Sequence, residues 1–396
     1  MNTISEQFSM IAKTVSGLEN LLAEELESLG ATDIQLRTRA VSFQGDKALM
    51  YKANYCLRTS LRVLKPVHQF VANNESALYD GVSKIHWHEI FKLEQTFAID
   101  AVVSGTYFNH SQYAALRVKD AIVDQFRDRF GARPSVDINQ PDLRISVYIA
   151  GDQVSILLDS SGESLHKRGY RTAVDKAPIN EVLAAGLIKI TGWQGDRPFV
   201  DAMCGSGTIP IEAAMFAMNI PPAYFRENFA FLNWPDFDSK LWEEVKAAAN
   251  EQIREIEVEI IGSDRSGKAV DIARENIRNA HLHKDIKLIK KPMEELTAPE
   301  GDGVLLINPP YGERLEEEDL TALYKLIGDS LKQGFKGYQA WVISSDQRAL
   351  KMVGLKPSKK YTVFNGPLEC RFARFDIFGG SYKAMKTAKN KDQPQA

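Results

Sequence analysis

The stretch LLINPPYGERL, residues 305–315, contains residues suited to holding a planar amine. Asn308 and Pro309 each precede a proline, which pushes their backbone towards extended geometry, so neither can begin a helix. Their side-chain amide oxygen and backbone carbonyl oxygen are two acceptors for an NH2 group, and Tyr311 offers a face on which a base can stack. Such acceptors can orient an exocyclic amine so that its lone pair points at an electrophile. A proline-rich turn with a buried tyrosine is the structural alternative.

A second group lies in DAMCGSGTIPIEAA, where Asp201, Gly205 and Gly207 fall on an expected strand-to-helix turn. Glycines let a ligand approach the backbone, and a helix N-terminus presents N–H groups to a carboxylate or phosphate. The pattern is neither a dinucleotide fingerprint, because a third glycine is missing, nor a Walker loop, because no Lys-Ser/Thr follows. A tight turn without a ligand remains the other interpretation.

Asp264 ends the next expected strand, in IIGSDRS. An acidic side chain at this position can accept hydrogen bonds from ribose hydroxyls. Asp264 could also, or instead, be the N-cap of a helix that starts near Gly267.

The elements that must position these turns alternate between helix and strand from about residue 177. Helices are expected at 179–192, 208–219, 266–282, 320–335 and 347–354, strands at 197–203, 257–264, 286–292, 303–308 and 340–346, and a hairpin at 359–378. This alternation builds a mostly parallel sheet covered by helices on both faces, with the hairpin as an antiparallel edge. Ligands bind outside the carboxyl ends of such strands. Residues 219–250 interrupt the alternation, and we expect them to form an insertion beside that edge.

The first 160 or so residues predict a small α+β assembly of one or two modules. A capping box and an amphipathic pattern indicate a helix that Gly30 ends. Strand-like segments are expected at 34–45 and 97–108, a helix at 111–131, and a hairpin around Gly151. The polar and basic segment SSGESLHKRGYR, residues 160–171, is where we place the domain boundary.

Composition is that of an ordinary globular chain. Its 396 residues predict two or three domains, and 44% are apolar and 26% charged. No apolar run approaches the roughly 20 residues needed to span a bilayer, and the first residues lack a secretory leader, so a cytoplasmic location is expected. The three widely spaced cysteines without a CxxC pattern argue against disulfides and structural zinc. His86, His88 and Glu89 lack a further ligand cluster, so no metal is predicted.

The net charge of -3 gives no overall signature for a nucleic acid, so such a partner must be bound by local basic patches. Three candidate patches are Arg127, Arg129 and Arg133; Lys167, Arg168 and Arg171; and, in the tail, Lys383, Lys386, Lys389 and Lys391. Each could also be a solvated surface without a partner.

Taken together, the glycine turn and the Asn-Pro-Pro-Tyr corner resemble the S-adenosylmethionine-dependent amino methyltransferases of nucleic acid. The segments HKRGYR…API, CGSGTIPIEAA and NPPYGERL resemble motifs of the bacterial THUMP-domain methyltransferases that modify guanine N2 in 23S ribosomal RNA. The resemblance covers nearly the whole chain, because LRVKDAIVDQFR…GARPSVD and its surroundings are similar to the ferredoxin-like and THUMP RNA-binding portion of that family.

The resemblance implies an α/β fold: a Rossmann-like class I methyltransferase domain preceded by an α+β ferredoxin-like/THUMP RNA-binding region. The implied domains are a ferredoxin-like region at 1–60, a THUMP domain at 61–162, a linker at 163–176, the methyltransferase domain at 177–382 and a basic tail at 383–396.

The resemblance also implies roles for individual residues. The methionine end of the cofactor would be bound by Asp201, Cys204, Gly205 and Gly207, and its ribose by Asp264. The target base would be held by Asn308, Pro309 and Tyr311. Two residues depart from the family pattern. Ala202 stands where proline is usual, and Pro292 stands where an acidic residue often meets the adenine, so that Glu294 or Glu295 could substitute.

The implied activity is transfer of a methyl group from S-adenosyl-L-methionine to the N2 amine of a guanine in 23S rRNA, with RNA as the partner and no membrane or metal. The alternatives are a tRNA guanine-N2 methyltransferase, a DNA adenine methyltransferase and a glutamine methyltransferase. An alternative that is not an enzyme is an RNA-binding factor of ribosome assembly.

Overall fold

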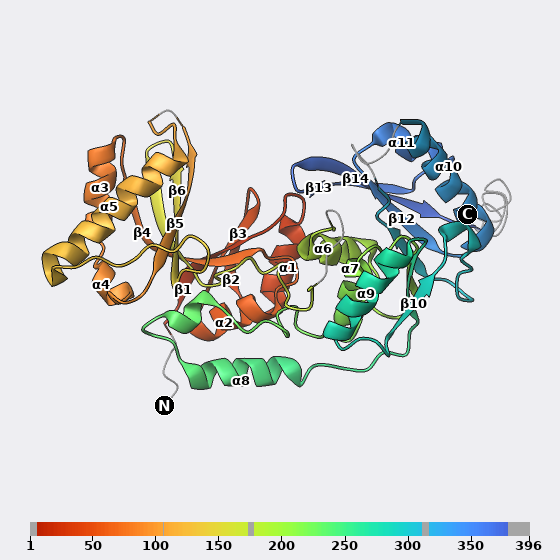
Figure 1. Cartoon of the computed structure of the whole chain (residues 1–396), viewed down its shortest axis with the longest axis horizontal. Coiled ribbons are helices and arrows are strands. Elements are labelled where there is room, and N and C mark those ends of the chain that lie inside the picture. Colours follow the sequence, from red (N-terminus) through yellow and green to blue (C-terminus); the bar gives the residue numbers. More distant parts are fainter. Residues whose placement is uncertain (1–5, 106, 173–177, 311–316, 379–396) are drawn as a thin grey trace, which may run out of the picture. The chain divides into compact units, whose positions relative to one another are not determined.

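The structure is a computed structural model that describes residues 6–105, 107–172, 178–310 and 317–378 (Figure 1). The chain divides into two compact units. Unit 1 comprises Met1–Val15, Glu19–Lys167 and Arg226–Glu251, and unit 2 comprises Ser16–Leu18, Arg168–Phe225 and Gln252–Ala396. The division after Lys167 falls inside the segment expected to hold the domain boundary.

Unit 1 is built on one seven-stranded sheet with the order β2-β3-β1-β4-β7-β6-β5. Its first part contains β1 (Phe8–Lys13), α1 (Glu19–Ser28), β2 (Thr32–Arg37), β3 (Ala40–Gly45), α2 (Lys47–Cys56) and β4 (Arg62–Val71). Its second part contains α3 (Glu75–Ser83), α4 (Trp87–Ile90), β5 (Phe97–Ser104), α5 (Ser111–Phe130), β6 (Leu143–Ala150) and β7 (Gln153–Asp159). Antiparallel pairing of β4 with β7 joins the two parts, so the two expected modules share a single sheet.

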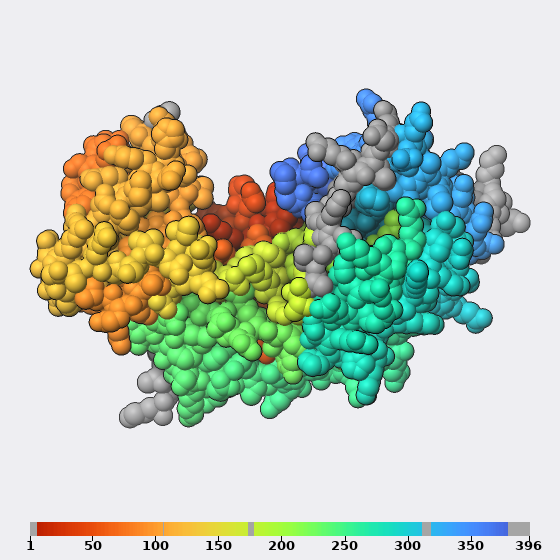
Figure 2. Space-filling view, viewed as in Figure 1, coloured from red at the N-terminus to blue at the C-terminus, as the bar shows by residue number. Residues whose placement is uncertain are grey.

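A helical segment from later in the chain completes unit 1. It contains the 3-10 helix η1 (Ala230–Asn233) and α8 (Ser239–Asn250), whose outer face lies at the surface, in green in Figure 2. Trp242 of α8 is buried, and its ring lies 5.8 Å from that of Tyr51 and 5.5 Å from that of Tyr55, both on α2. We predicted that this segment is an insertion beside the second sheet. That prediction was wrong, because the segment belongs to unit 1 and its Trp242 is buried against α2.

Unit 2 is a doubly wound α/β unit with a second seven-stranded sheet, in the order β10-β9-β8-β11-β12-β14-β13. Its helices are α6 (Glu181–Thr191), α7 (Thr208–Ala217), α9 (Gly267–Asn279), the 3-10 helix η2 (Met293–Glu295), α10 (Glu317–Gly334) and α11 (Gln347–Met352). Its strands are β8 (Phe199–Asp201), β9 (Ile260–Asp264), β10 (Ile286–Lys290), β11 (Val304–Ile307), β12 (Gln339–Ser344), β13 (Lys359–Asn365) and β14 (Leu368–Asp376). Strands β8 to β12 pair in parallel, and β14 and β13 form the expected antiparallel edge.

Helices cover both faces of this sheet because its strands are apolar on both sides. Phe199 and Val304 belong to the core formed with α6, α7 and α9, whereas the next residues along each strand, Val200 and Leu305, belong to the core formed with α10 and α11. Figure 1 shows the two helical layers on opposite sides of the strands.

The order of strands creates a switch point between β8 and β11. From β8 the chain moves outward to β9 and β10, and then returns to β11 on the other side of β8. Loops at the carboxyl ends of β8 and β11 therefore diverge, which leaves room for a ligand. No helix of the described residues is long and apolar enough to cross a membrane.

Candidate active site

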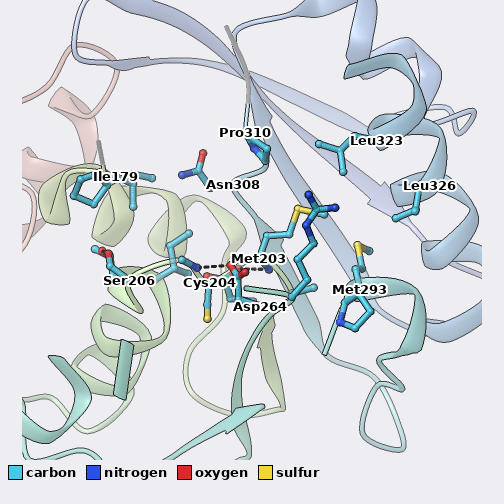
Figure 3. A pocket seen from close by; sticks show the side chains of 18 of the residues that line it. Ile179, Met203, Cys204, Ser206, Asp264, Met293, Asn308, Pro310, Leu323 and Leu326 are labelled. Carbon is cyan, nitrogen blue, oxygen red and sulfur yellow. Dashed lines mark hydrogen bonds between the residues drawn. The ribbon is translucent and has the colours of Figure 1, made fainter. Parts of the chain in front are cut away.

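A cavity of about 600 Å³ opens at the carboxyl ends of β8, β9, β10 and β11 (Figure 3). Its volume suits a small-molecule ligand. The wall contains Asp201, Cys204, Gly205, Asp264 and Asn308, all singled out from the sequence. Leu305 of β11 pairs with Val200 of β8, so that Asn308 and the glycine turn emerge at the same edge of the sheet. The two turns singled out from the sequence therefore line one cavity.

The glycine turn leads from β8 into α7. Gly205 has φ of 52° and Gly207 has φ of 83°, both in the left-handed region that favours glycine. A Cβ at Gly205 would meet no atom within 4 Å, whereas one at Gly207 would lie 3.2 Å from Cβ of Ala273 on α9. Gly205 therefore leaves open space at the cavity, and Gly207 permits close packing of α7 against α9.

Asp201 brings a buried carboxyl group to the wall of the cavity. Only 1% of the residue is exposed, and its Oδ1 accepts a hydrogen bond of 3.1 Å from the backbone N–H of Met203. Its Oδ2 is buried and has no hydrogen-bond partner in the described part of the chain. Burial raises the pKa of Asp201 well above its usual value, and the charge of Asp264 adds to the rise. Such a carboxyl group is poised to receive a cationic or hydrogen-donating ligand.

We expect Asp201→Asn to stabilise the protein without ligand at pH 7, by about 1–2 kcal/mol, because it removes the cost of ionising a buried carboxyl group. Because its pKa is raised, the folded protein holds the proton of Asp201 more tightly than the unfolded chain does. The free energy of unfolding is therefore highest below the unfolded pKa of Asp201 and falls as the pH rises from there through the folded pKa. Thermal unfolding between pH 4 and 8 checks this: the variant should show the flatter profile. A variant that melts below the wild type at pH 7 would show that the ionised carboxylate is stabilised.

Asp264 ties the ends of β9 and β8 together. Its Oδ2 accepts from the backbone N–H of Gly205 at 3.0 Å, and its Oδ1 accepts from that of Ser266 at 2.8 Å. The N-cap of α9 is Ser266, which accepts from the N–H of Ala269, so the alternative role of Asp264 as that N-cap was wrong. Each carboxylate oxygen has a second lone pair that a hydroxyl group could reach.

Asn308 follows the last residue of β11 and lines the cavity. Figure 3 shows its amide beside Pro310, on the same cavity as Cys204 and Asp264. Its Oδ1 is buried and accepts no hydrogen bond from the described residues. Leaving a buried acceptor unpaired costs about 1–3 kcal/mol, so this oxygen points to a missing donor. Pro309 is buried, and Tyr311 lies outside the described residues.

The turn after β10 supplies another part of the wall, through Pro292, Met293 and Glu294. In the family that this chain resembles, an acidic residue that contacts the adenine is usual where Pro292 stands. Of the two nearby glutamates that could replace it, Glu294 lines the cavity and Glu295 does not, so Glu294 is the better placed. Cys204 is buried, and burial raises the pKa of its thiol well above the usual value, which suits a small turn residue more than a nucleophile.

The basic residues expected to contact RNA lie in different surroundings. Arg127, Arg129 and Arg133 are exposed, and Arg127 pairs with Asp124 at 3.2 Å. Lys167 is exposed and pairs with Glu163.

Arg168 and Arg171, the other two members of this predicted patch, are not open to solvent. Arg168 is only 1% exposed, with Nε 3.4 Å from Oε1 of the buried Glu212. It therefore offers no surface to a phosphate, and we do not carry it into the proposed interface. Arg171 is largely buried as well, and its Nε lies 3.0 Å from Oε1 of Glu181.

Sequence reasoning missed several residues of the wall. They are Ile179, Met203, Thr208, Arg265, Met293, Asp319, Leu323 and Leu326. Arg265 and Met203 could have been found as neighbours of the predicted residues. Leu323 and Leu326 of α10 carry no local signal, because an apolar position on a helix looks alike whether it faces a core or a cavity. Among the described residues, no three His, Cys, Asp or Glu side chains gather to hold a metal ion.

Comparison with known proteins agrees with this architecture. Residues 9–64 match the model of the RlmL ferredoxin-like domain, residues 72–159 that of the THUMP domain, and residues 168–374 that of the RMKL-like methyltransferase domain. A protein of Synechocystis sp., provisionally assigned as RNA methyltransferase slr0064, is 39% identical over 378 residues, which cover 95% of this chain and 98% of that protein.

Two further relatives extend the comparison. The ribosomal RNA large subunit methyltransferase K/L of Syntrophotalea carbinolica is 40% identical over 379 residues, 92% of this chain, and the chain spans 53% of the length of that relative. The crystal structure of SMU.472, provisionally a methyltransferase and complexed with SAH, aligns with a TM-score of 0.86 at 33% identity, over 96% of this chain and all of the other.

Fold and site together define a class I methyltransferase that uses S-adenosylmethionine. More particularly, the chain belongs to the family with an RMKL-like methyltransferase domain, carried behind RlmL ferredoxin-like and THUMP domains. The predicted fold class, family and cofactor are thereby confirmed. The predicted boundaries at residues 60, 162, 176 and 382 stay predictions.

Proposed function

We propose that this protein methylates the N2 amino group of a guanine in 23S ribosomal RNA. The observation that carries the proposal is the buried Oδ1 of Asn308, which has no hydrogen-bond partner among the described residues and lies on the same cavity as the glycine turn. A planar NH2 group is the donor that such an oxygen lacks, and guanine presents one at N2. The THUMP match and the RNA methyltransferase names of the two curated relatives favour RNA as the carrier of that base. A substrate of this kind is consistent with a cytoplasmic location.

The residues present fit the cofactor. Asp201 brings a buried carboxyl group, whose ionised form a nearby sulfonium or ammonium group would favour, to the wall of the cavity, and the second lone pairs of Asp264 suit ribose hydroxyls. Gly205 leaves the backbone open to the methionine end, and Glu294 lies at the edge expected for the adenine. The cofactor supplies an electrophilic methyl group whose sulfonium is itself the activating group.

The protein therefore contributes orientation more than acid-base chemistry. We assign the acceptors for the amine to Oδ1 of Asn308 and the carbonyl oxygen of Pro309, and base stacking to Tyr311. The amine nitrogen gains a bond to the methyl carbon as the carbon–sulfur bond breaks, and its proton then leaves to solvent. Unstacking the guanine costs a few kcal/mol, which contacts to the flanking RNA must offset.

Methyl transfer to defined RNAs tests the proposal. Purified protein with labelled S-adenosylmethionine should label 23S rRNA but neither tRNA nor DNA, and mass mapping should find the label on guanine N2. Labelling of tRNA instead would favour the tRNA enzyme. If calorimetry detected no binding of S-adenosylhomocysteine, the non-catalytic assembly factor would replace the enzyme.

We propose Arg127, Arg129 and Arg133 as contacts to the RNA backbone; they lie at and after the exposed C-terminal end of α5. Replacing all three with alanine is expected to weaken RNA binding at least about tenfold in low salt and to reduce the salt dependence by about three ion units. Binding titrations at several salt concentrations check this.

A charge-matched variant serves as control for this prediction. It replaces the exposed Lys84, Lys92 and Lys240, which lie elsewhere in the same unit. Equal losses in the two variants would show that only net charge matters and would remove α5 from the interface.

A further inference from the structure

The segment that opens unit 2 is anchored to the helix that follows the glycine turn. Arg168 Nε lies 3.4 Å from Glu212 Oε1 on α7, and the hydroxyl group of Tyr170 donates to the same oxygen at 3.0 Å. All three side chains are buried. A buried polar group of this kind holds its elements in one arrangement, because breaking any contact leaves a charge or donor unpaired.

The same segment also reaches the glycine turn through α9. The N–H of Thr172 donates to Oδ1 of Asn276 at 3.3 Å, and Nδ2 of Asn276 donates to the carbonyl oxygen of Ser206 at 3.0 Å. Ser206 lies between the two glycines of the turn and lines the cavity. The backbone of residues 168–172 is therefore fixed against both helices that flank the turn.

Arg171 is the member of this segment that contacts the cavity wall. Its Nη2 donates to Oγ1 of Thr208 at 2.7 Å and to the carbonyl oxygen of Ile179 at 3.3 Å. Its Nε lies 3.0 Å from Oε1 of Glu181, the first residue of α6. Thr208 and Ile179 both line the cavity, although they come from different segments. One guanidinium group thus sets the spacing of two pieces of the wall.

We propose that Arg171 is a positioning residue for the cofactor pocket, acting through Thr208 and Ile179 rather than through a contact to RNA. The inference rests on the proposed role of this cavity. An arginine is required because its planar fork presents several N–H groups in a fixed geometry, whereas a lysine presents one flexible point charge. A phosphate contact would instead tolerate lysine, because an ammonium group also binds phosphate.

Lysine is also the substitution that spares the neighbouring charge. Glu181 is buried enough that its pKa rises to about 7, against the opposing effect of Arg171. A neutral side chain at position 171 would leave this carboxylate without its cation and would endanger the fold. Arg171→Lys keeps a positive charge beside Glu181 and removes only the planar guanidinium group with its several N–H donors.

The experiment compares Arg171→Lys with the wild type by calorimetry with S-adenosylhomocysteine and by RNA titration. We expect the Kd for S-adenosylhomocysteine to rise about tenfold and the Kd for RNA to stay within about twofold. An unchanged Kd for S-adenosylhomocysteine overturns the inference, whether or not RNA binding falls. If the wild type itself failed to bind S-adenosylhomocysteine, the proposed function would fail instead.

Tyr170→Phe is the matched control, because it removes one buried hydrogen bond from the same segment without touching the cavity wall. It should lower the melting temperature and leave the Kd for S-adenosylhomocysteine unchanged. If it raised that Kd as much as Arg171→Lys does, Arg171 would act only through general stability. Should Arg171→Lys not fold, Thr208→Val decides, because it removes the hydroxyl acceptor of Arg171: a raised Kd supports the inference, and an unchanged Kd overturns it.

Discussion

Asn308→Ala is expected to lower the rate of methyl transfer to RNA by at least about 10² to 10³, while the Kd for S-adenosylhomocysteine changes by less than about twofold. The side chain directly follows β11, and its buried Oδ1 accepts no hydrogen bond from the part of the chain that the structure describes. Under the proposed function, its loss removes an acceptor for the target amine and leaves the cofactor turn intact. Removing one preorganised hydrogen-bonding group from an active site typically costs this much in rate. Single-turnover kinetics at saturating RNA, paired with calorimetry, measure the two quantities separately.

Asn308→Asp is the control for this result, because it keeps an oxygen acceptor at the same place and changes the side chain's volume little. It should retain more transfer activity than the alanine variant, although its charge is costly in a half-buried position. Full turnover by Asn308→Ala would show that the acceptor pair does not orient the amine. A parallel loss of cofactor affinity would place Asn308 among the cofactor contacts instead.

Much of unit 2 was predictable because its local signals agree with its tertiary structure. Asn180 caps the start of α6 and Gly192 ends it with φ of 76°, as the helical pattern of residues 179–192 indicates. The hairpin of β13 and β14 turns at Gly366 and Pro367, directly after Asn365, and Gly366 adopts the positive φ of 61° that such a turn needs at its first position. Apolar strands with helices between them then leave few arrangements other than a parallel sheet.

The relations that escaped prediction are those between distant residues. Pairing of β4 with β7 joins two stretches of sheet, and nothing in either strand's own sequence specifies the other as its partner. From the sequence, the segment that contains α8 was interpreted as an insertion; the structure instead packs its Trp242 beside Tyr51 and Tyr55 of α2.

The sequence also does not show whether a basic side chain is exposed to solvent or buried against an acidic one. Arg168 and Lys167 are adjacent and both basic, yet Arg168 meets a buried glutamate on α7, while Lys167 is exposed and pairs with Glu163. Spacing identified the residues at the carboxyl ends of β8, β9 and β11, because that rule depends only on strand order. It could not identify the wall contributed by α10.

Asp264→Ala is expected to raise the Kd for S-adenosylhomocysteine about 30- to 100-fold, and to leave the rate of transfer at saturating cofactor within a few fold of the wild type. The loss corresponds to about 2–3 kcal/mol, in the range for hydrogen bonds to a charged group. Two causes contribute. Ribose hydroxyls would lose their acceptor, and the N–H of Gly205, which Asp264 Oδ2 holds at 3.0 Å, would lose its partner in the glycine turn.

A ligand without ribose hydroxyls separates these two causes. The 2′,3′-dideoxy analogue of S-adenosylhomocysteine cannot donate to Asp264, so the wild type should bind it more weakly than the parent compound. In Asp264→Ala the two ligands should bind almost equally, because the hydroxyls no longer have an acceptor to lose. If the alanine variant still preferred the parent ligand by the full wild-type factor, Asp264 would act only by holding Gly205, and the ribose contact would belong to another residue of the wall.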